Sequence, residues 1–378
     1  MKKKNNYSLR KFINDIHLWL GLASGIILFV VCFTGTVLVF EHEIKDFFAE
    51  ELKVEATKKK QTIESLIKTL QSSNNGYISS FTIPHQDSEP YAFYVKKDLK
   101  ERRGTEVLVN PYNQELLKVE KTNADAFMLT LFKLHRWLLL DTQIGRPIVG
   151  VATIIFLLLS ISGIVLWFPK KMSWRNIKQG LKIKTHAKWK RVNHDLHNTL
   201  GFYACLLLLI MAITGLCWSF DGYREGLGHV IGTKIFDRSS PQFETINTTN
   251  ANISIDEIIK IANETLDYKG NLSVTFPNKE DTYFSIRKYN EDNLSPVTSD
   301  RLYLSISGEI LKVEKFKDKP LNQKIAALIK PIHTGEIFGT FSKIIYFLVC
   351  LIATSLPVTG TIIWINKMKT KSKKKIKK

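Results

Sequence analysis

Four long apolar runs dominate the hydropathy of this chain, and amphipathic stretches separate them. The runs are Leu18–Phe40, Ile148–Phe168, Asn198–Phe220 and Ile344–Ile365. Because a helix needs about 20 apolar residues to cross a bilayer, each run predicts a membrane-spanning helix. The first run follows a basic start, as a signal peptide does. It ends in VLVFEHE, without a small-residue cleavage site, so we expect this helix to be retained.

The regions between the spans carry a different pattern. Each contains a stretch whose apolar residues recur at helical spacing, TIESLIKTLQ in one region and SIDEIIKIANETL in the other. Stretches of alternating apolar and polar residues follow, such as YISSFTI and YAFYVKK in the first region and NLSVTF and TYFSIRKY in the second. Each region therefore predicts a small α+β domain with one helix on three or four strands. Neither sequence shows a nucleophile–base pair, a metal cluster or a Gly-rich phosphate loop.

The charge pattern predicts the orientation of the spans. The 378 residues include 54 Lys and Arg against 35 Asp and Glu, a formal net charge of +19. Three segments without acidic residues hold 22 of the basic ones: residues 1–12 hold five, 169–193 hold nine and 366–378 hold eight. Lys and Arg collect on the cytoplasmic side of membrane proteins, so we expect both termini inside and residues 41–134 and 221–341 outside. The basic excess thus indicates topology. A solvated tail such as KMKTKSKKKIKK could also touch anionic lipid, and we expect no nucleic-acid partner.

The two halves of the chain resemble each other. IHLWLG…FTGTVLVF aligns without a gap on LHNTLG…ITGLCWSF, so that His17 falls on His197. KLHRWLL…SGIVLWFPKK aligns on PIHTGEIFG…TGTIIWINKM, so that His135 falls on His333. This repeat predicts an internal duplication in which each half supplies a helix, an outer domain, a histidine and a second helix.

These four histidines are candidate metal ligands. In the predicted topology His17 and His197 lie at the cytoplasmic face, and His135 and His333 lie at the outer face. Histidine is costly inside a bilayer and usually functional there. Two imidazoles at each face is the arrangement that bis-histidine ligation of two b-type haems requires.

Two further features favour haem over a bare metal ion. Gly21 and Gly201 each follow a histidine by four residues, so they share its helical face and leave room for a flat macrocycle. Cations that could pair with haem propionates accompany both faces; they are Arg10, Lys11, Lys190 and Arg191 inside and Arg136 and Lys330 outside. A zinc site would require a third or fourth ligand.

The same residues allow other interpretations. A histidine at a helix end can be an interfacial residue whose tip contacts water. His194 lies three residues before His197 on the same helical face, so it can be the axial ligand instead. The four cysteines all fall within the apolar runs, which predicts core packing, and no Cys-x-x-Cys-His is present to attach a c-type haem.

The combination of motifs resembles the PepSY-associated transmembrane helix family, iron-regulated bacterial inner-membrane proteins that include ferric-siderophore reductases. The motifs are IHLWLGL with FTGTVLVF, LHRWLL with SGIVLWFPKK, NHDLHNTLG with ITG, and IHTGEIFG with TGTIIW, and the likeness covers nearly the whole chain. It implies four helices, two PepSY-like outer units, two b-type haems and electron transfer to an iron chelate. The implied ligands are His17, His135, His197 and His333, with His194 as a further candidate.

The expected fold is a mainly α membrane protein with four spans in an internally duplicated arrangement and two small α+β domains outside the cytoplasm. We divide the chain into the N-terminus and first span (1–40), the first PepSY-like domain (41–134), an outer histidine segment with the second span (135–168), a basic loop (169–193), the third span (194–220), the second PepSY-like domain (221–332), an outer histidine segment with the fourth span (333–365) and a basic tail (366–378).

The expected activity is that of an oxidoreductase in the bacterial inner membrane, which reduces a ferric siderophore or other iron chelate and releases Fe(II). Its electron donor is cytoplasmic or in the membrane and is not named by the sequence, which has no G-x-G-x-x-G. One alternative is a haem-free, membrane-anchored binding or regulatory protein that acts through its outer domains. Another is a b-type cytochrome with a different acceptor, such as copper or a quinone.

Overall fold

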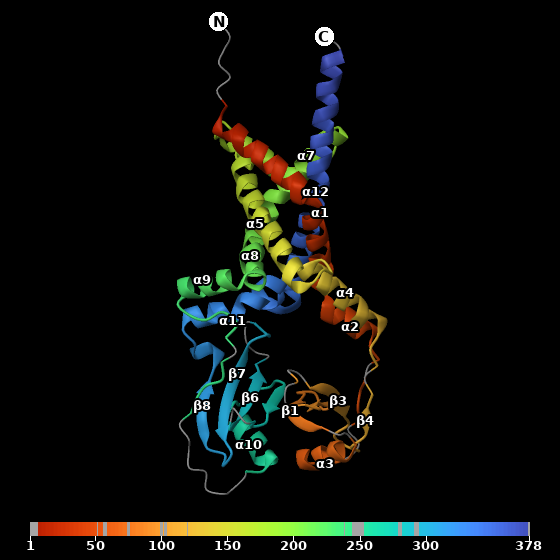
Figure 1. Cartoon of the computed structure of the whole chain (residues 1–378), viewed down its shortest axis with the longest axis vertical. Coiled ribbons are helices and arrows are strands. Elements are labelled where there is room, and N and C mark those ends of the chain that lie inside the picture. The colour runs from red at the N-terminus through yellow and green to blue at the C-terminus, as the bar shows by residue number, and fades with distance from the viewer. Residues whose placement is uncertain are drawn as a thin grey trace. The chain divides into compact units, whose positions relative to one another are not determined.

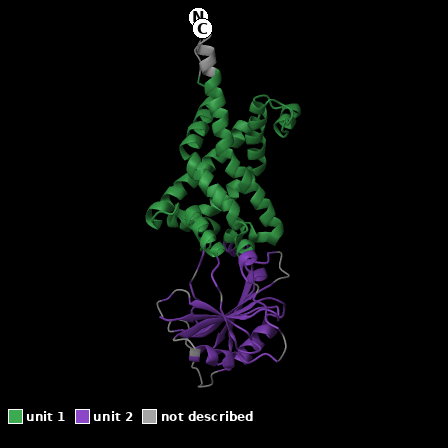
Figure 2. Ribbon diagram, turned by 90° about the vertical axis from the view of Figure 1, so that its right-hand side faces the viewer, with its two compact units in different colours: residues 1–45, 123–235, 328–378 green, residues 46–122, 236–327 purple. Residues whose placement is uncertain are grey.

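The computed structural model describes residues 7–50, 52–55, 59–73, 76–98, 101, 104–118, 120–237, 239–243, 253–278, 282–290 and 295–376. The chain forms two compact units, coloured separately in Figure 2. Unit 1 comprises residues 1–45, 123–235 and 328–378, and unit 2 comprises residues 46–122 and 236–327. Three lysines of the basic N-terminal segment precede residue 7 and lie outside the described residues.

Unit 1 is built from helices (Figure 1). They are α1 (Leu9–Leu38), α4 (Asn123–Trp137), α5 (Thr142–Trp167), α6 (Trp174–Gly180), α7 (Trp189–Asp195), α8 (Gly201–Ser219), α9 (Asp221–Ile231) and α12 (Gly339–Ile376). Two further helices, α2 (Glu41–Phe48) and α11 (Leu321–Thr334), belong partly to unit 1 and partly to unit 2. A π-helical turn, Leu196–Leu200, joins α7 to α8, and a 3-10 turn, Glu336–Phe338, precedes α12.

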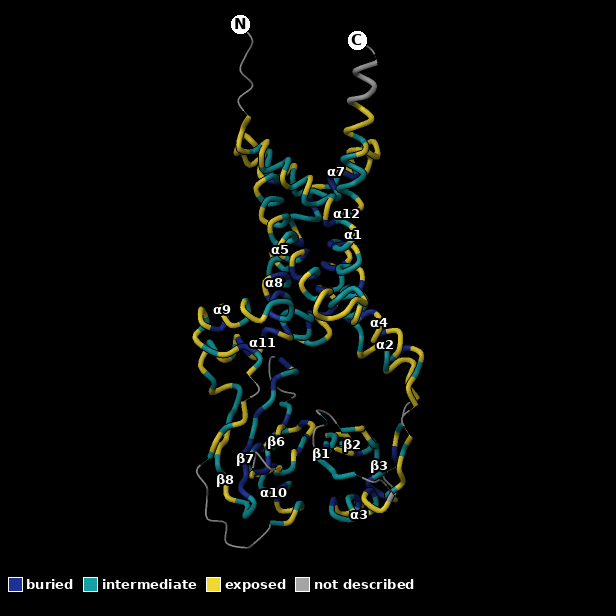
Figure 3. Tube along the Cα trace, in the orientation of Figure 1, coloured by how far each residue is buried: buried dark blue, intermediate teal, exposed yellow. Residues whose placement is uncertain are grey.

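Four helical segments are long and apolar enough to cross a membrane: Leu9–Leu38, Thr142–Trp167, Trp189–Ser219 and Glu336–Thr370. They match the four apolar runs of the sequence and extend beyond them at the N-terminal side. The spans carry many exposed residues (Figure 3). Large apolar ones are among them, for example Ile26 at 83% and Leu206 at 69% exposure. Exposure of this kind is expected where lipid is the solvent. The chain is therefore a multi-pass membrane protein.

Small residues line the contacts between the spans. Helix α1 packs against α12 and α5, and α5 packs against α8. Ser24, Ala204 and Ala353 are buried at 3%, 1% and 2% exposure. Thr36 and Thr354 join α1 to α12 through hydroxyl groups 3.2 Å apart. Small side chains allow helix backbones to approach closely in a membrane, and this approach positions the histidines described below.

Unit 2 contains one eight-stranded antiparallel sheet. Its strands are β1 (Tyr77–Ile83), β2 (Tyr91–Lys96), β3 (Thr105–Val109), β4 (Leu116–Leu117), β5 (Leu272–Thr275), β6 (Tyr283–Tyr289), β7 (Ser299–Ser305) and β8 (Ile310–Glu314). Their order is β4-β3-β2-β1-β5-β6-β7-β8. Both regions between the spans thus contribute four strands to a common sheet.

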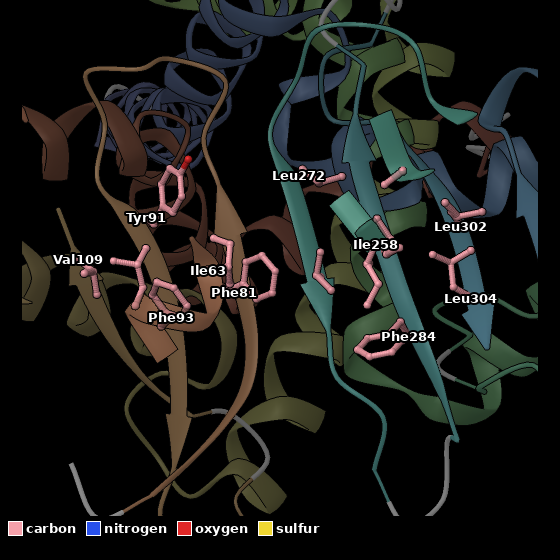
Figure 4. Close-up of a cluster of buried hydrophobic side chains, with 14 of the residues drawn as sticks. Ile63, Phe81, Tyr91, Phe93, Val109, Ile258, Leu272, Phe284, Leu302 and Leu304 are labelled. Carbon is pink, nitrogen blue, oxygen red and sulfur yellow. The ribbon is translucent and has the colours of Figure 1, made fainter. Parts of the chain in front are cut away.

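The pairing of β1 with β5 joins the two regions, with Phe81 opposite Val274. Alternate residues of the strands and one face of each of the helices α3 (Ile63–Ser73) and α10 (Ile255–Thr265) form a single hydrophobic core (Figure 4). Phe81, Leu66 and Ile258 are each 0% exposed in it. The alternating pattern of the strand places Phe81 on the core face, and the helical spacing of apolar residues places Leu66 and Ile258 there.

Replacing Phe81 by alanine should loosen the junction between the two halves of the sheet. Phe81 packs against Phe93 and Phe276, with ring centres 5.8 and 5.7 Å apart. A buried Phe→Ala change costs about 3–5 kcal/mol, so amide exchange of β1 and β5 in the full chain should accelerate. Thr82→Ala, which removes only a hydroxyl contact to Ser273, should cost about 1 kcal/mol. Equal exchange rates in the two variants would contradict this account.

Candidate functional site

His17 and His197 lie next to each other in unit 1. His17 is on α1, and His197 is on the π-helical turn, a kind of turn that often occurs at functional sites. Their ring centres are 6.5 Å apart and their ring planes meet at 89°. Imidazoles on opposite sides of one metal ion have ring centres roughly 6.3 Å apart, because each metal–nitrogen bond is about 2 Å long. The pair therefore has the spacing of two axial ligands.

A cavity of about 660 Å³ opens beside this pair. Both histidines line it, and so do Gly21 and Gly201, the two glycines expected to leave room for a macrocycle. Most of the other lining residues are apolar, and four are cationic: Arg10, Lys11, Lys170 and Lys367. An apolar cavity with cations in its wall suits a flat apolar ring that carries carboxylates.

A hydroxyl group sets the tautomer of His17. Ser162 on α5 donates its hydroxyl proton to its own helix, to the carbonyls of Leu158 and Leu159 at 2.7 and 3.1 Å. The Ser162 oxygen can therefore only accept a hydrogen bond from His17 Nδ1, which lies 2.8 Å away. His17 Nδ1 must therefore carry the proton and donate it. The lone pair of the ring is consequently on Nε2.

The same arrangement holds His197. Thr359 on α12 donates its hydroxyl proton to the carbonyl of Ser355 at 2.9 Å, and His197 Nδ1 lies 2.9 Å from the Thr359 oxygen. The amide of the buried Asn193 donates to the Thr359 carbonyl at 3.0 Å and ties the π-helical turn to α12. Metal-binding histidines commonly donate their second ring nitrogen in this way, which orients the ring.

His135 and His333 have equivalent partners on two other helices. His135 Nδ1 lies 2.9 Å from the carbonyl of Val31 and 3.2 Å from the hydroxyl of Thr34 on α1. His333 Nδ1 lies 3.0 Å from the carbonyl of Met211 and 3.2 Å from the hydroxyl of Thr214 on α8. Each Nδ1 thus donates into a helix, and Nε2 again keeps the lone pair. The partners of the two histidines are 180 positions apart in sequence, as the alignment of the halves predicts.

Each of the four imidazoles also packs against a glycine. A Cβ atom at Gly35 would lie 3.0 Å from His135 Cε1, and one at Gly215 would lie 2.9 Å from His333 Cε1. The corresponding distances are 3.5 Å from Gly163 to His17 and 3.2 Å from Gly360 to His197. Each glycine directly follows the hydroxyl residue that bonds the same ring. The structure therefore contains four Ser/Thr–Gly pairs, each holding one imidazole.

Sequence reasoning did not assign a role to these pairs. They are Thr34–Gly35, Ser162–Gly163, Thr214–Gly215 and Thr359–Gly360. The signal was present, because a Ser/Thr–Gly dipeptide recurs in each of the four spans. The partner of each dipeptide is a histidine on another helix, so the role became apparent only in the folded chain.

Burial keeps the His135 and His333 rings neutral. Both lie outside the four spans, on α4 and α11. Burial, with a smaller contribution from the nearby His135, lowers the pKa of His333 to about 4. Burial likewise lowers the pKa of His135. Both imidazoles are therefore neutral at pH 7, as a metal ligand must be.

Other residues that the sequence singled out do not share the buried, hydrogen-bonded environment of the four histidines. His194 lines the cavity, but its side chain is 53% exposed and its Nδ1 lies 3.7 Å from the carboxylate of Asp195. Arg191 binds Asp195 at 2.8 Å and does not line the cavity, whereas Lys170, which was not among the candidate cations, does. Arg136 follows His135, and its guanidinium packs over the ring of Trp137 at 5.7 Å.

The donor set fits a macrocyclic metal group better than a bare ion. Within the described part of the chain, no group of three or more His, Cys, Asp or Glu side chains could hold a metal ion. Each site instead offers neutral imidazoles whose Nδ1 atoms are already engaged. Two axial nitrogens suffice for haem because the porphyrin supplies the other four.

Spans of this length, packed around buried and oriented imidazoles, define an integral membrane protein with histidine sites inside its helical unit. A search of curated proteins gives no match. The family model described as the PepSY-associated TM region matches residues 15–367. The chain therefore belongs to the PepSY-associated TM family, as its motifs indicated.

Proposed function

We propose that this protein is a di-haem reductase of the bacterial inner membrane, which passes electrons across the bilayer to a ferric siderophore and releases Fe(II). The observation that carries the proposal is the fourfold arrangement of a histidine on a Ser/Thr–Gly pair. In each case Nδ1 donates a hydrogen bond and Nε2 keeps its lone pair. A merely interfacial histidine would need neither a fixed tautomer nor a glycine against its ring.

The two sites are separated along the spans. His17 bonds its partner near one end of the bundle, whereas His135 bonds Thr34, which is 17 positions further along α1. At 1.5 Å per residue this is about 25 Å, close to the roughly 30 Å of a hydrocarbon core. All four cations that line the cavity of the His17/His197 pair come from the three basic segments without acidic residues, so the positive-inside rule supports a cytoplasmic position for this pair and for both termini.

Different residues would have different roles in such a site. Bound haems supply reversible one-electron chemistry at iron. His17 and His197 would hold one haem and His135 and His333 the other. Apolar lining excludes water, and the cations beside the inner cavity can pair with propionates. Hard oxygen ligands bind Fe(II) less well than Fe(III), so reduction of the bound iron lowers the affinity of the chelator for it.

Ferric and gallium siderophores provide a direct test. Haem-loaded protein is reduced with dithionite in detergent, without oxygen, and is then mixed with ferric hydroxamates and catecholates. We expect reoxidation of the haem spectrum and a ferrous signal with ferrozine. The gallium forms have the same charge and nearly the same size but accept no electron, so they should leave the haems reduced.

Equal reoxidation by the ferric and gallium forms would rule out direct reduction of the chelate. Reoxidation by copper or a quinone alone would keep the cytochrome and replace the substrate. A haem-to-protein ratio near zero, after expression with an adequate haem supply, would reject the redox function itself.

A further inference from the structure

The basic segment 169–193, here called the basic platform, is fixed to the helices of unit 1. The Gly180 carbonyl accepts hydrogen bonds from Trp167 Nε1 at 3.3 Å and from the Thr199 hydroxyl at 2.9 Å. The Leu181 carbonyl accepts one from the Tyr203 hydroxyl at 3.0 Å. A charged loop that only sets topology requires no such attachment, since the positive-inside rule depends on charge alone.

The basic platform carries a dense positive charge. Its nine Lys and Arg residues are accompanied by no Asp or Glu. Arg175, Lys178, Lys182 and Lys188 are exposed. The adjoining Asp195 is 3% exposed and pairs with Arg191, so it neutralises one of these charges and leaves the others unpaired with it. A surface of one sign raises the association rate of an oppositely charged partner.

The basic platform touches the wall of the His17/His197 cavity. Trp167, which donates to Gly180, stacks on Phe202 with ring centres 3.7 Å apart and planes within 11°. Phe202 and Lys170 both line the cavity. A continuous packed path therefore runs from the platform backbone through two aromatic rings to the cavity.

We propose that the basic platform docks a small acidic electron-carrier protein, with a flavin or iron–sulfur group, which delivers electrons to the His17/His197 site. The inference rests on the proposed function and names its missing donor. In the transfer, the reduced carrier would lose one electron, and a haem held by His17 and His197 would take it up, so that one centre is oxidised and the other reduced by one electron. No atom or proton needs to move with it.

A protein partner suits the platform better than lipid headgroups do. Trp174 is 67% exposed, but the Lys178 ammonium lies 5.5 Å from the centre of its ring. Insertion of this indole into hydrocarbon would break its contact with the Lys178 ammonium, because the flexible lysine side chain keeps its charge in water. An exposed aromatic ring surrounded by cations is instead typical of a protein interface, with an aromatic anchor and a polar rim.

Charge reversal on the platform tests the docking. The variant pair Lys178→Glu and Lys182→Glu changes exposed residues that do not line the cavity. The matched control pair, Lys68→Glu and Lys97→Glu, makes the same change in charge on exposed residues of unit 2. The probe is bacterial flavodoxin, an acidic flavoprotein. Binding of its oxidised form and the rate of haem reduction by its reduced form are measured at low and high salt.

We expect the platform variant to weaken flavodoxin binding, and to slow reduction, by roughly tenfold or more at low salt, with the difference shrinking as salt rises. The control variant should behave as the parent, and dithionite should reduce all three proteins equally. Equal flavodoxin binding by all three would overturn the proposal. Weaker binding of the platform variant to phosphatidylglycerol vesicles, with unchanged binding to flavodoxin, would also overturn it and would identify the platform as a lipid contact. The haem spectrum is recorded separately, so a parent protein without haem would count against the proposed function, whereas a haem-loaded parent that does not bind flavodoxin would count against the docking.

Discussion

His17→Ala and His197→Ala should each remove the same haem, and His135→Ala and His333→Ala should each remove the other. In the proposed function each histidine would hold one haem together with one other histidine, so an alanine would leave that haem with a single imidazole. We therefore expect a pyridine haemochrome of about two haems per chain in the parent to fall to about one in each single variant. The two groups of variants should lose different components of the reduced-minus-oxidised spectrum.

His194→Ala is the matched control for this series. It removes a histidine from the same cavity, three residues from His197, but its ring is half exposed. We expect the inner component to persist in this variant. If His194→Ala erased that component and His197→Ala retained it, the assignment of the axial ligand would pass to His194. If all five variants kept two haems, bis-histidine ligation would be wrong.

Gly215→Val should expel the outer haem and spare the inner one. A Cβ at this position would lie 2.9 Å from His333 Cε1, tighter than a carbon–carbon contact allows, and two further methyl groups would add to the clash. The imidazole must then rotate away from Thr214 and Met211, which hold its Nδ1. Loss of such orienting partners alone weakens metal sites about 10–100-fold. We expect near-complete loss of one haem in the absorbance spectrum.

Gly226→Val provides the control, because a Cβ at Gly226 has no atom within 4 Å. It introduces the same β-branched residue into a helix and should retain both haems. The inner component, if present in Gly215→Val, also shows that the protein has folded. Retention of the outer component in that variant would contradict the role given to the Ser/Thr–Gly pairs.

The amino-acid sequence alone predicted the four spans and the family, and both are confirmed. The free energy of transfer into lipid depends on about 20 consecutive residues, so it can be summed along the sequence without knowledge of tertiary contacts. The alternating stretches YAFYVKK and TYFSIRKY likewise became strands β2 and β6, because the side-chain period of a strand is a local property. The four histidines were selected by the repeat, and their role as haem ligands stays a prediction.

Only the tertiary structure decided which groups hold each histidine and how the strands join. His17 meets Ser162 across 145 positions, and Phe81 pairs with Val274 although the second and third spans lie between them in the sequence. The attachment of the basic platform through Gly180 is of the same kind, because it depends on which side chains of α5 and of the π-helical turn face that carbonyl. Such contacts have no local periodicity in the sequence. They arise from the packing of helices and strands, and the relative positions of these elements cannot be read from the order of residues.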